Sequence, residues 1–96
     1  MKHIVMWKLA DDDSKAENMI KIKNGLEGLN GKIDGMRSAE VGINVNGSDM
    51  AFDVVLVSEF DGAKALDAYQ KNPLHLEVAS FVRSVAVERR VVDYEN

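Results

Sequence analysis

Three polar aromatic residues, His3, Tyr69 and His75, are the side chains of this sequence best suited to chemistry. Histidine changes charge near neutral pH and can act as a general acid or base. His75 falls on a helical stripe of apolar residues, which predicts that its ring faces the interior. We interpret His75 as a candidate general base, or as a donor to a bound carbonyl group, assisted by the hydroxyl of Tyr69.

Each candidate also has a structural interpretation. An imidazole at the start of a helix often braces a backbone carbonyl group, which is the alternative for His75. His3 lies in the first predicted strand, either as a second polar group in the same cavity or as a strand-end histidine bonded to the backbone. Trp7 is a candidate cavity wall or core residue. The ring of Tyr69 can pack while its hydroxyl meets solvent, so the residue types alone leave both interpretations open.

Periodicity predicts the elements of the first half of the chain. Residues 2–9 predict a strand covered on both faces, because apolar side chains alternate to both sides. One face carries His3, Val5, Trp7 and Leu9, and the other carries Ile4 and Met6. Residues 15–30 predict an amphipathic helix with Met19, Ile22, Leu26 and Leu29 on one stripe. Ser14 and Glu17 have the spacing of a capping box, and Gly31 is the expected end of the helix.

The second half predicts two strands, two helical segments and a last strand. Residues 36–45 and 51–60 should form a hairpin through an Asn46-Gly47 turn, with Phe52, Val54, Leu56 and Phe60 on one face. Asp61 should cap a short helix that runs through Tyr69, and Asn72-Pro73 should open a longer one. Residues 85–94 predict the last strand. This β-α-β-β-α-β order predicts an α+β chain of ferredoxin-like fold with an antiparallel sheet, as a single domain over residues 1–96.

Several strands are apolar on both faces, although two helices cover only one face of such a sheet. An apolar second face needs a cover, and a second copy related by a two-fold axis supplies one. The sequence therefore predicts a homodimer. The alternative is that these apolar side chains are tolerated at the surface.

Composition excludes several classes of function. The net charge is −4 and no run of basic residues occurs, so we expect no nucleic-acid partner. With no cysteine, disulfides, thiolate catalysis and cysteine-bound metals are excluded. Adjacent aspartates at positions 11–13 are typical of a solvated helix entry and lack the spacing of a calcium loop, so we expect no metal and no cofactor. The start of the chain resembles neither a signal peptide nor a membrane span, so we expect a cytoplasmic protein.

Four phrases occur in an order that resembles a known family. They are the stretch Lys2-His3-Ile4-Val5-Met6-Trp7-Lys8, Glu40-Val41-Gly42 with Asn44, Tyr69 with Asn72-Pro73-Leu74-His75, and Val92-Asp93-Tyr94. Over the whole chain this is similar to the stress-responsive A/B barrel family, also called the dimeric α+β barrel or Dabb family. The resemblance implies a ferredoxin-like subunit, two copies of which close into a barrel with an internal cavity.

The resemblance also implies candidate functions. Many members have no assigned activity, which favours a stress-associated protein that binds a small apolar or aromatic molecule in the cavity. One member, olivetolic acid cyclase, is a plant polyketide cyclase without cofactor or metal, and its tyrosine and histidine have the spacing of Tyr69 and His75. That resemblance implies that His75 and Tyr69 are catalytic and that His3 lies in the same site. We take His3 and Trp7 as the candidate ligand-binding residues. Asn72 stands where the phrase usually has histidine. A cofactor-independent monooxygenase and a purely structural interaction module are further alternatives.

Overall fold

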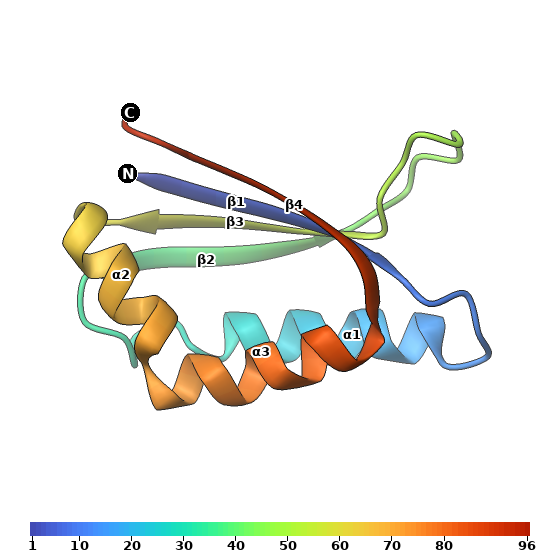
Figure 1. Ribbon diagram of the computed structural model, residues 1–96, viewed down its shortest axis with the longest axis horizontal. Coiled ribbons are helices and arrows are strands. Elements are labelled where there is room, and N and C mark those ends of the chain that lie inside the picture. Colours follow the sequence, from blue (N-terminus) through green and yellow to red (C-terminus); the bar gives the residue numbers. More distant parts are fainter.

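The computed structural model describes residues 1–96 as one antiparallel sheet with its helices on a single face (Figure 1). In chain order the elements are β1 (Lys2–Leu9), α1 (Lys15–Glu27), β2 (Met36–Ile43), β3 (Val54–Phe60), α2 (Ala63–Lys71), α3 (Pro73–Val85) and β4 (Ala86–Tyr94). The strand order is β2-β3-β1-β4, so β1 and β3 are central and β4 is an edge strand. This confirms the predicted ferredoxin-like fold, with its second helical region divided at Asn72.

Alternation along β1 decides which side chains face the helices. His3, Val5, Trp7 and Leu9 are buried, as predicted, whereas Met6 is 40% exposed on the opposite face. Val5 pairs with Leu56 of β3 and with Val91 of β4, so these side chains share the helix-facing side of the sheet. The core therefore lies between this side of the sheet and the helices, and it is the layer in which a site could be enclosed.

The start of α1 differs from the predicted capping box. The Ser14 side chain makes no capping hydrogen bond. The backbone N–H of Ser14 instead donates to the Asp12 carboxylate over 2.9 Å. Asp12 thus fixes the turn that leads into the helix, a local side-chain-to-backbone contact that competes with the capping geometry.

The end of α1 comes earlier than residue 30 because the residues that follow bind the edge strand β2. Asn30 accepts from the backbone N–H of Ala39 over 2.9 Å and donates to its carbonyl oxygen over 2.8 Å. The Glu27 carboxylate accepts from the backbone N–H of Val41 over 2.9 Å. That bond, followed by the bond from Lys23, holds the pKa of Glu27 below its usual value. These side chains satisfy backbone groups that an edge strand otherwise leaves unpaired.

The connection between β2 and β3 pairs the predicted strands but does not form the predicted tight turn. Ile43 pairs with Val54, so residues 44–53 form a longer loop and Val45 is fully exposed. The side chain of Asn44 binds both the N–H and the carbonyl oxygen of Asn46, which holds that segment in a local turn of its own. Phe52 precedes the strand and lies beside Met6 on the face away from the helices, in contrast to the predicted face.

Helices α2 and α3 meet at Asn72. Asp61 does not cap α2, because its carboxylate pairs with Arg37 over 2.7 Å. Asn72 caps α3 as predicted, with its side-chain oxygen accepting from the backbone N–H of Leu74 over 2.8 Å. Tyr69 in α2 and His75 in α3 consequently lie on the two sides of this junction.

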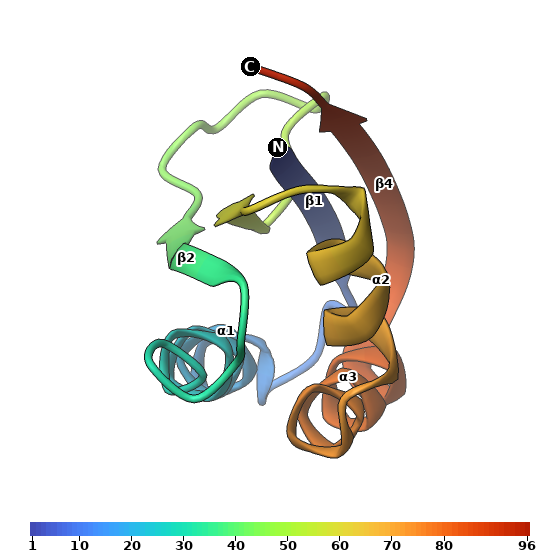
Figure 2. The ribbon, with the colours of Figure 1, turned by 90° about the vertical axis from the view of Figure 1, so that its left-hand side faces the viewer.

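Figure 2 shows α1 and α3 side by side on one face of the sheet. Gly25 permits their contact, since a Cβ at this position would lie 3.0 Å from Val78 of α3. The opposite face of the sheet is open and carries an apolar centre, in which Ile4 of β1 lies between Val57 and Val92. Val92 is 60% exposed, so this predicted second apolar face is present and uncovered in the single chain. None of the three helices combines the length and apolar character needed to cross a bilayer.

Candidate functional site

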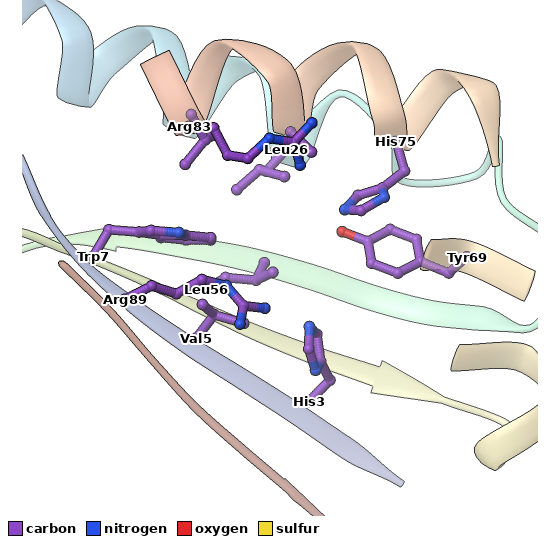
Figure 3. Close-up of a pocket in the computed structure, with 11 residues that line it drawn as sticks. His3, Val5, Trp7, Leu26, Leu56, Tyr69, His75, Arg83 and Arg89 are labelled. Carbon is purple, nitrogen blue, oxygen red and sulfur yellow. The ribbon is translucent and has the colours of Figure 1, made fainter. Parts of the chain in front are cut away.

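All four predicted site residues line one cavity. It measures about 330 Å³ and lies between the helix-facing side of the sheet and helices α2 and α3 (Figure 3). Its wall is formed by His3, Val5, Trp7, Leu26, Leu56, Tyr69, His75, Ala79, Val82, Arg83 and Arg89. These residues face the helices of their own chain, so the cavity is built by one chain, away from the open face.

His3 is held at the floor of the cavity by a carboxylate. The ring is 3% exposed, and its Nδ1 is hydrogen-bonded to Asp93, which lies directly opposite on β4. The His3 carbonyl oxygen also accepts from the Ser58 hydroxyl over 2.7 Å. A carboxylate at Nδ1 keeps the proton of a neutral imidazole on that nitrogen and leaves Nε2 as the acceptor. The contact with Asp93 therefore fixes the orientation and the tautomer of the His3 ring.

Tyr69 lines the cavity from α2 with a buried side chain. Its side chain is 2% exposed, and its ring packs on Phe60 with centroids 4.9 Å apart. Burial raises the pKa of Tyr69 to about 12. The hydroxyl points into the cavity (Figure 3) and stays protonated at neutral pH, so it can donate a hydrogen bond to an oxygen atom that gains negative charge.

His75 lies beside Tyr69, with the two ring centroids 4.1 Å apart. Burial lowers the pKa of His75, and the charges of His3, Arg83 and Arg89 act in the same direction. The backbone of Gln70 opposes this shift, although the buried Nδ1 forms no hydrogen bond of ordinary geometry. The imidazole is therefore neutral at pH 7, and it lines the cavity beside Tyr69.

The lowered pKa of His75 predicts a pH-dependent stability. Between its usual pKa and the lower folded value, the unfolded chain binds a proton that the folded chain does not. This contribution to stability is thus complete above the usual pKa of histidine, about 6.5, and is lost as the pH falls through that value toward the lower folded pKa. Urea unfolding of the wild type and of His75→Gln should show that the variant loses part of this slope, and parallel slopes would contradict the assignment.

Two cavity residues, Arg83 and Arg89, were missed by sequence reasoning. Arg83 lies eight residues after His75, which is the same face of α3, so helical spacing contained a signal for it. Arg89 pairs with Trp7 across the β1–β4 register and shares its face of the sheet. That pairing, like the one between His3 and Asp93, depends on a register that the two segments do not reveal separately. Nowhere in the chain do three or more His, Asp or Glu side chains form a group that could hold a metal ion.

Comparison with known proteins identifies the family. The family model of the stress responsive A/B barrel domain, Dabb, matches residues 1–96. The chain belongs to the Dabb family. An uncharacterized protein of Streptomyces coelicolor is 30% identical over 98 residues, a match that covers 99% of the Dabb chain and 98% of the relative.

Solved structures agree with this fold. A dimeric protein of unknown function and ferredoxin-like fold from Bacteroides fragilis is 35% identical, with a TM-score of 0.91 over 99% of the Dabb chain and 94% of that structure. A hydroxynitrile lyase from Passiflora edulis is 16% identical, with a TM-score of 0.73 over 97% and 89% of the two chains. The resemblance found in the sequence is confirmed at the level of family and fold.

The cavity of this Dabb chain combines two imidazole rings, a tyrosine hydroxyl and apolar walls. Rings of His3 and Tyr69 lie 6.3 Å apart, and His75 adjoins Tyr69, so the three polar groups open onto one space. Trp7, 7% exposed, forms an apolar wall together with Val5 and Leu56. An apolar cavity with a few convergent polar groups is typical of a small-molecule site, and about 330 Å³ is at the small end of the range for such sites.

Proposed function

We propose that this Dabb protein binds a small, largely apolar carbonyl compound in the cavity and catalyses proton transfer on it without a cofactor. One observation carries the proposal: a histidine oriented by a carboxylate opens onto the same cavity as a buried, protonated tyrosine. When one group of a site is an oriented imidazole and another is a hydroxyl that stays protonated, the first can act as the base and the second as the acid.

Each group has a defined role in the proposed step. Nε2 of His3 removes a proton from the carbon next to the carbonyl group. The electron pair of that C–H bond forms a carbon–carbon double bond, and the π pair of the carbonyl group moves onto its oxygen. The hydroxyl of Tyr69 donates to this oxygen and stabilises its negative charge. The protonated His3 then returns a proton, or a deuteron taken up from solvent, to that carbon, and the carbonyl group forms again. His75 was our predicted base, but only His3 has an orienting carboxylate, so we assign His75 as a second polar contact beside Tyr69.

The relatives support an enzyme by analogy only. The Passiflora protein is named a hydroxynitrile lyase, and at 16% identity it shares the fold with this chain. A fold can carry unrelated chemistries, so the weight rests on the site itself.

We also propose that the protein is a homodimer through its open face. The Bacteroides fragilis relative, 35% identical, is dimeric. The apolar centre around Ile4 and Val92 is a surface that a second copy would remove from water. Native mass spectrometry of the intact protein should record the mass of two chains.

Exchange of carbon-bound protons tests the catalytic proposal without knowledge of the natural substrate. In deuterated buffer, the wild type should speed the loss of the α-proton signal of 1-indanone, a neutral aromatic ketone, over the buffer rate. Tyr69→Phe should lower the catalysed rate by about 10²-fold, as expected for loss of one donor to an oxyanion. Tyr94→Phe makes the same change on the open side of the sheet and should leave the rate unchanged.

Two outcomes would count against the proposal. If 1-indanone and its ring-substituted analogues exchange no faster with protein than without it, the chain binds without turnover. If Tyr69→Phe exchanges as fast as the wild type while remaining folded, Tyr69 is a packing residue.

A further inference from the structure

The arginines of this chain fall into two classes. Arg37 and Arg90 are paired with carboxylates, Arg37 with Asp61 over 2.7 Å and Arg90 with Glu88 over 3.3 Å. Arg83 and Arg89 line the cavity and form no ion pair within the chain. An unpaired guanidinium beside an apolar cavity retains five hydrogen-bond donors and its charge for another partner.

Arg83 and Arg89 come from different elements and reach toward the same space. In Figure 3 the Arg83 side chain extends from α3 on one wall, and Arg89 extends from β4 on the other. Both residues, together with Trp7, also border a smaller hollow of about 190 Å³ next to the cavity. The two guanidinium groups therefore stand at the boundary between the cavity and the surface, where a charged group of a ligand can remain partly solvated.

Two cationic side chains line the cavity, and the Asp93 carboxylate reaches it only through its hydrogen bond to His3. No aspartate or glutamate belongs to its wall, and no lysine does either, so the two arginines are its only permanently charged groups. Their charge acts inside the site, since Arg83 and Arg89 contribute to the lowered pKa of His75. A neutral apolar ligand would leave both charges unused.

We propose that the molecule bound in this cavity is an apolar, most simply aromatic, carboxylate whose anionic group is held by Arg83 and Arg89. This inference rests on the proposed function for the position of the ligand and adds its chemical class. The planar guanidinium matches a carboxylate through two parallel hydrogen bonds, which favours arginine over lysine for this purpose. The ring system then packs against Trp7 and Leu56, which points its other end toward His3 and Tyr69.

The test compares two probes of the same shape and different charge, 2-naphthoate and 2-naphthamide, by isothermal titration calorimetry. The wild type should bind 2-naphthoate at least about tenfold more tightly than 2-naphthamide, the effect of charge-assisted hydrogen bonds. Arg83→Gln and Arg89→Gln should each weaken 2-naphthoate without a change for 2-naphthamide, and the double variant should bind both equally.

Arg90→Gln is the matched control. Arg90 is the next residue on β4, is similarly exposed, and faces the other side of the sheet, so it loses the same charge without touching the cavity. Its affinity for 2-naphthoate should equal that of the wild type. Circular dichroism melting checks that each variant is folded, and the single variants decide the question if the double variant is unstable.

The outcomes separate this inference from the proposed function. Equal affinity of the wild type for the two probes, no binding of 2-naphthoate, or unchanged binding by both single variants would overturn the inference. If the protein catalyses exchange of 1-indanone but binds 2-naphthoate no more tightly than 2-naphthamide, the catalytic proposal stands and the inference of a carboxylate ligand is wrong. If 2-naphthoate binds through the arginines and no exchange occurs with any ketone, the ligand class stands and the catalytic role fails.

Discussion

Replacing His3 with glutamine is expected to lower the catalysed exchange of 1-indanone by about 10²-fold to 10⁴-fold, the usual contribution of a general base. Glutamine can keep a hydrogen bond to Asp93 but offers no imidazole nitrogen of comparable basicity to the cavity. His3 is the only cavity histidine with an orienting carboxylate, so its loss should exceed that of any other single change in the site. Proton NMR of the ketone in deuterated buffer gives the rate.

Asp93→Asn isolates the orienting contact from the base itself. An amide at this position no longer favours the proton on Nδ1 of His3, so we expect the exchange rate to fall while the affinity for 2-naphthoate stays close to the wild-type value. Asp67→Asn on α2, which removes an exposed ion pair with Lys71, is the control for loss of one carboxylate.

Full exchange activity in His3→Gln would reassign the base to His75.

Phe60→Ala is expected to give the largest loss of stability, about 3–5 kcal/mol in the free energy of unfolding. Phe60 is 1% exposed, and its ring meets Tyr69 at 4.9 Å and His3 at 6.3 Å between centroids. Removing it leaves a void beside the rings of His3 and Tyr69. Because small domains have only about 5–15 kcal/mol of net stability, this change alone should bring the chain close to unfolding.

Urea unfolding at a fixed protein concentration measures this loss, since self-association would otherwise shift the apparent stability. Phe81→Ala, at a half-buried position on α3, provides a matched comparison and should cost clearly less. Equal costs at the two positions would mean that the layer under Tyr69 collapses around the missing ring. Phe60→Leu should recover most of the stability, because it keeps most of the buried apolar volume.

The sequence pattern was sufficient to predict those features of the fold that depend on one segment of the chain. Alternation along β1 correctly grouped His3 and Trp7 on one face, although apolar residues on both faces did not indicate which one the helices cover. The Asn72-Pro73 pair predicted the start of α3. Each of these features depends on neighbours in sequence, so periodicity and capping chemistry describe it fully. The same holds for the inward direction of His75.

Features that depend on contacts between separate segments could not be predicted from the sequence pattern. Asn30 leaves the predicted helix because it binds the backbone of Ala39, and no property of residues 15–30 indicates that partner. The Asn46-Gly47 signal gave the wrong turn because the neighbouring Asn44 side chain supplies competing hydrogen bonds. Asp93 and Arg89 join the site only through the antiparallel register of β1 with β4.

The pairing of β1 with β4 has a consequence for biosynthesis. His3 and its carboxylate partner are 90 positions apart, and the first and last strands lie side by side in the sheet. During translation, the segment with His3 and Trp7 leaves the ribosome long before Arg89 and Asp93 are made. Until β4 docks, β1 is an unpaired edge that can recruit other chains. A polypeptide interrupted before β4 therefore lacks both the carboxylate that binds His3 and one of the two cavity arginines, so the proposed site can form only after β4 has been made.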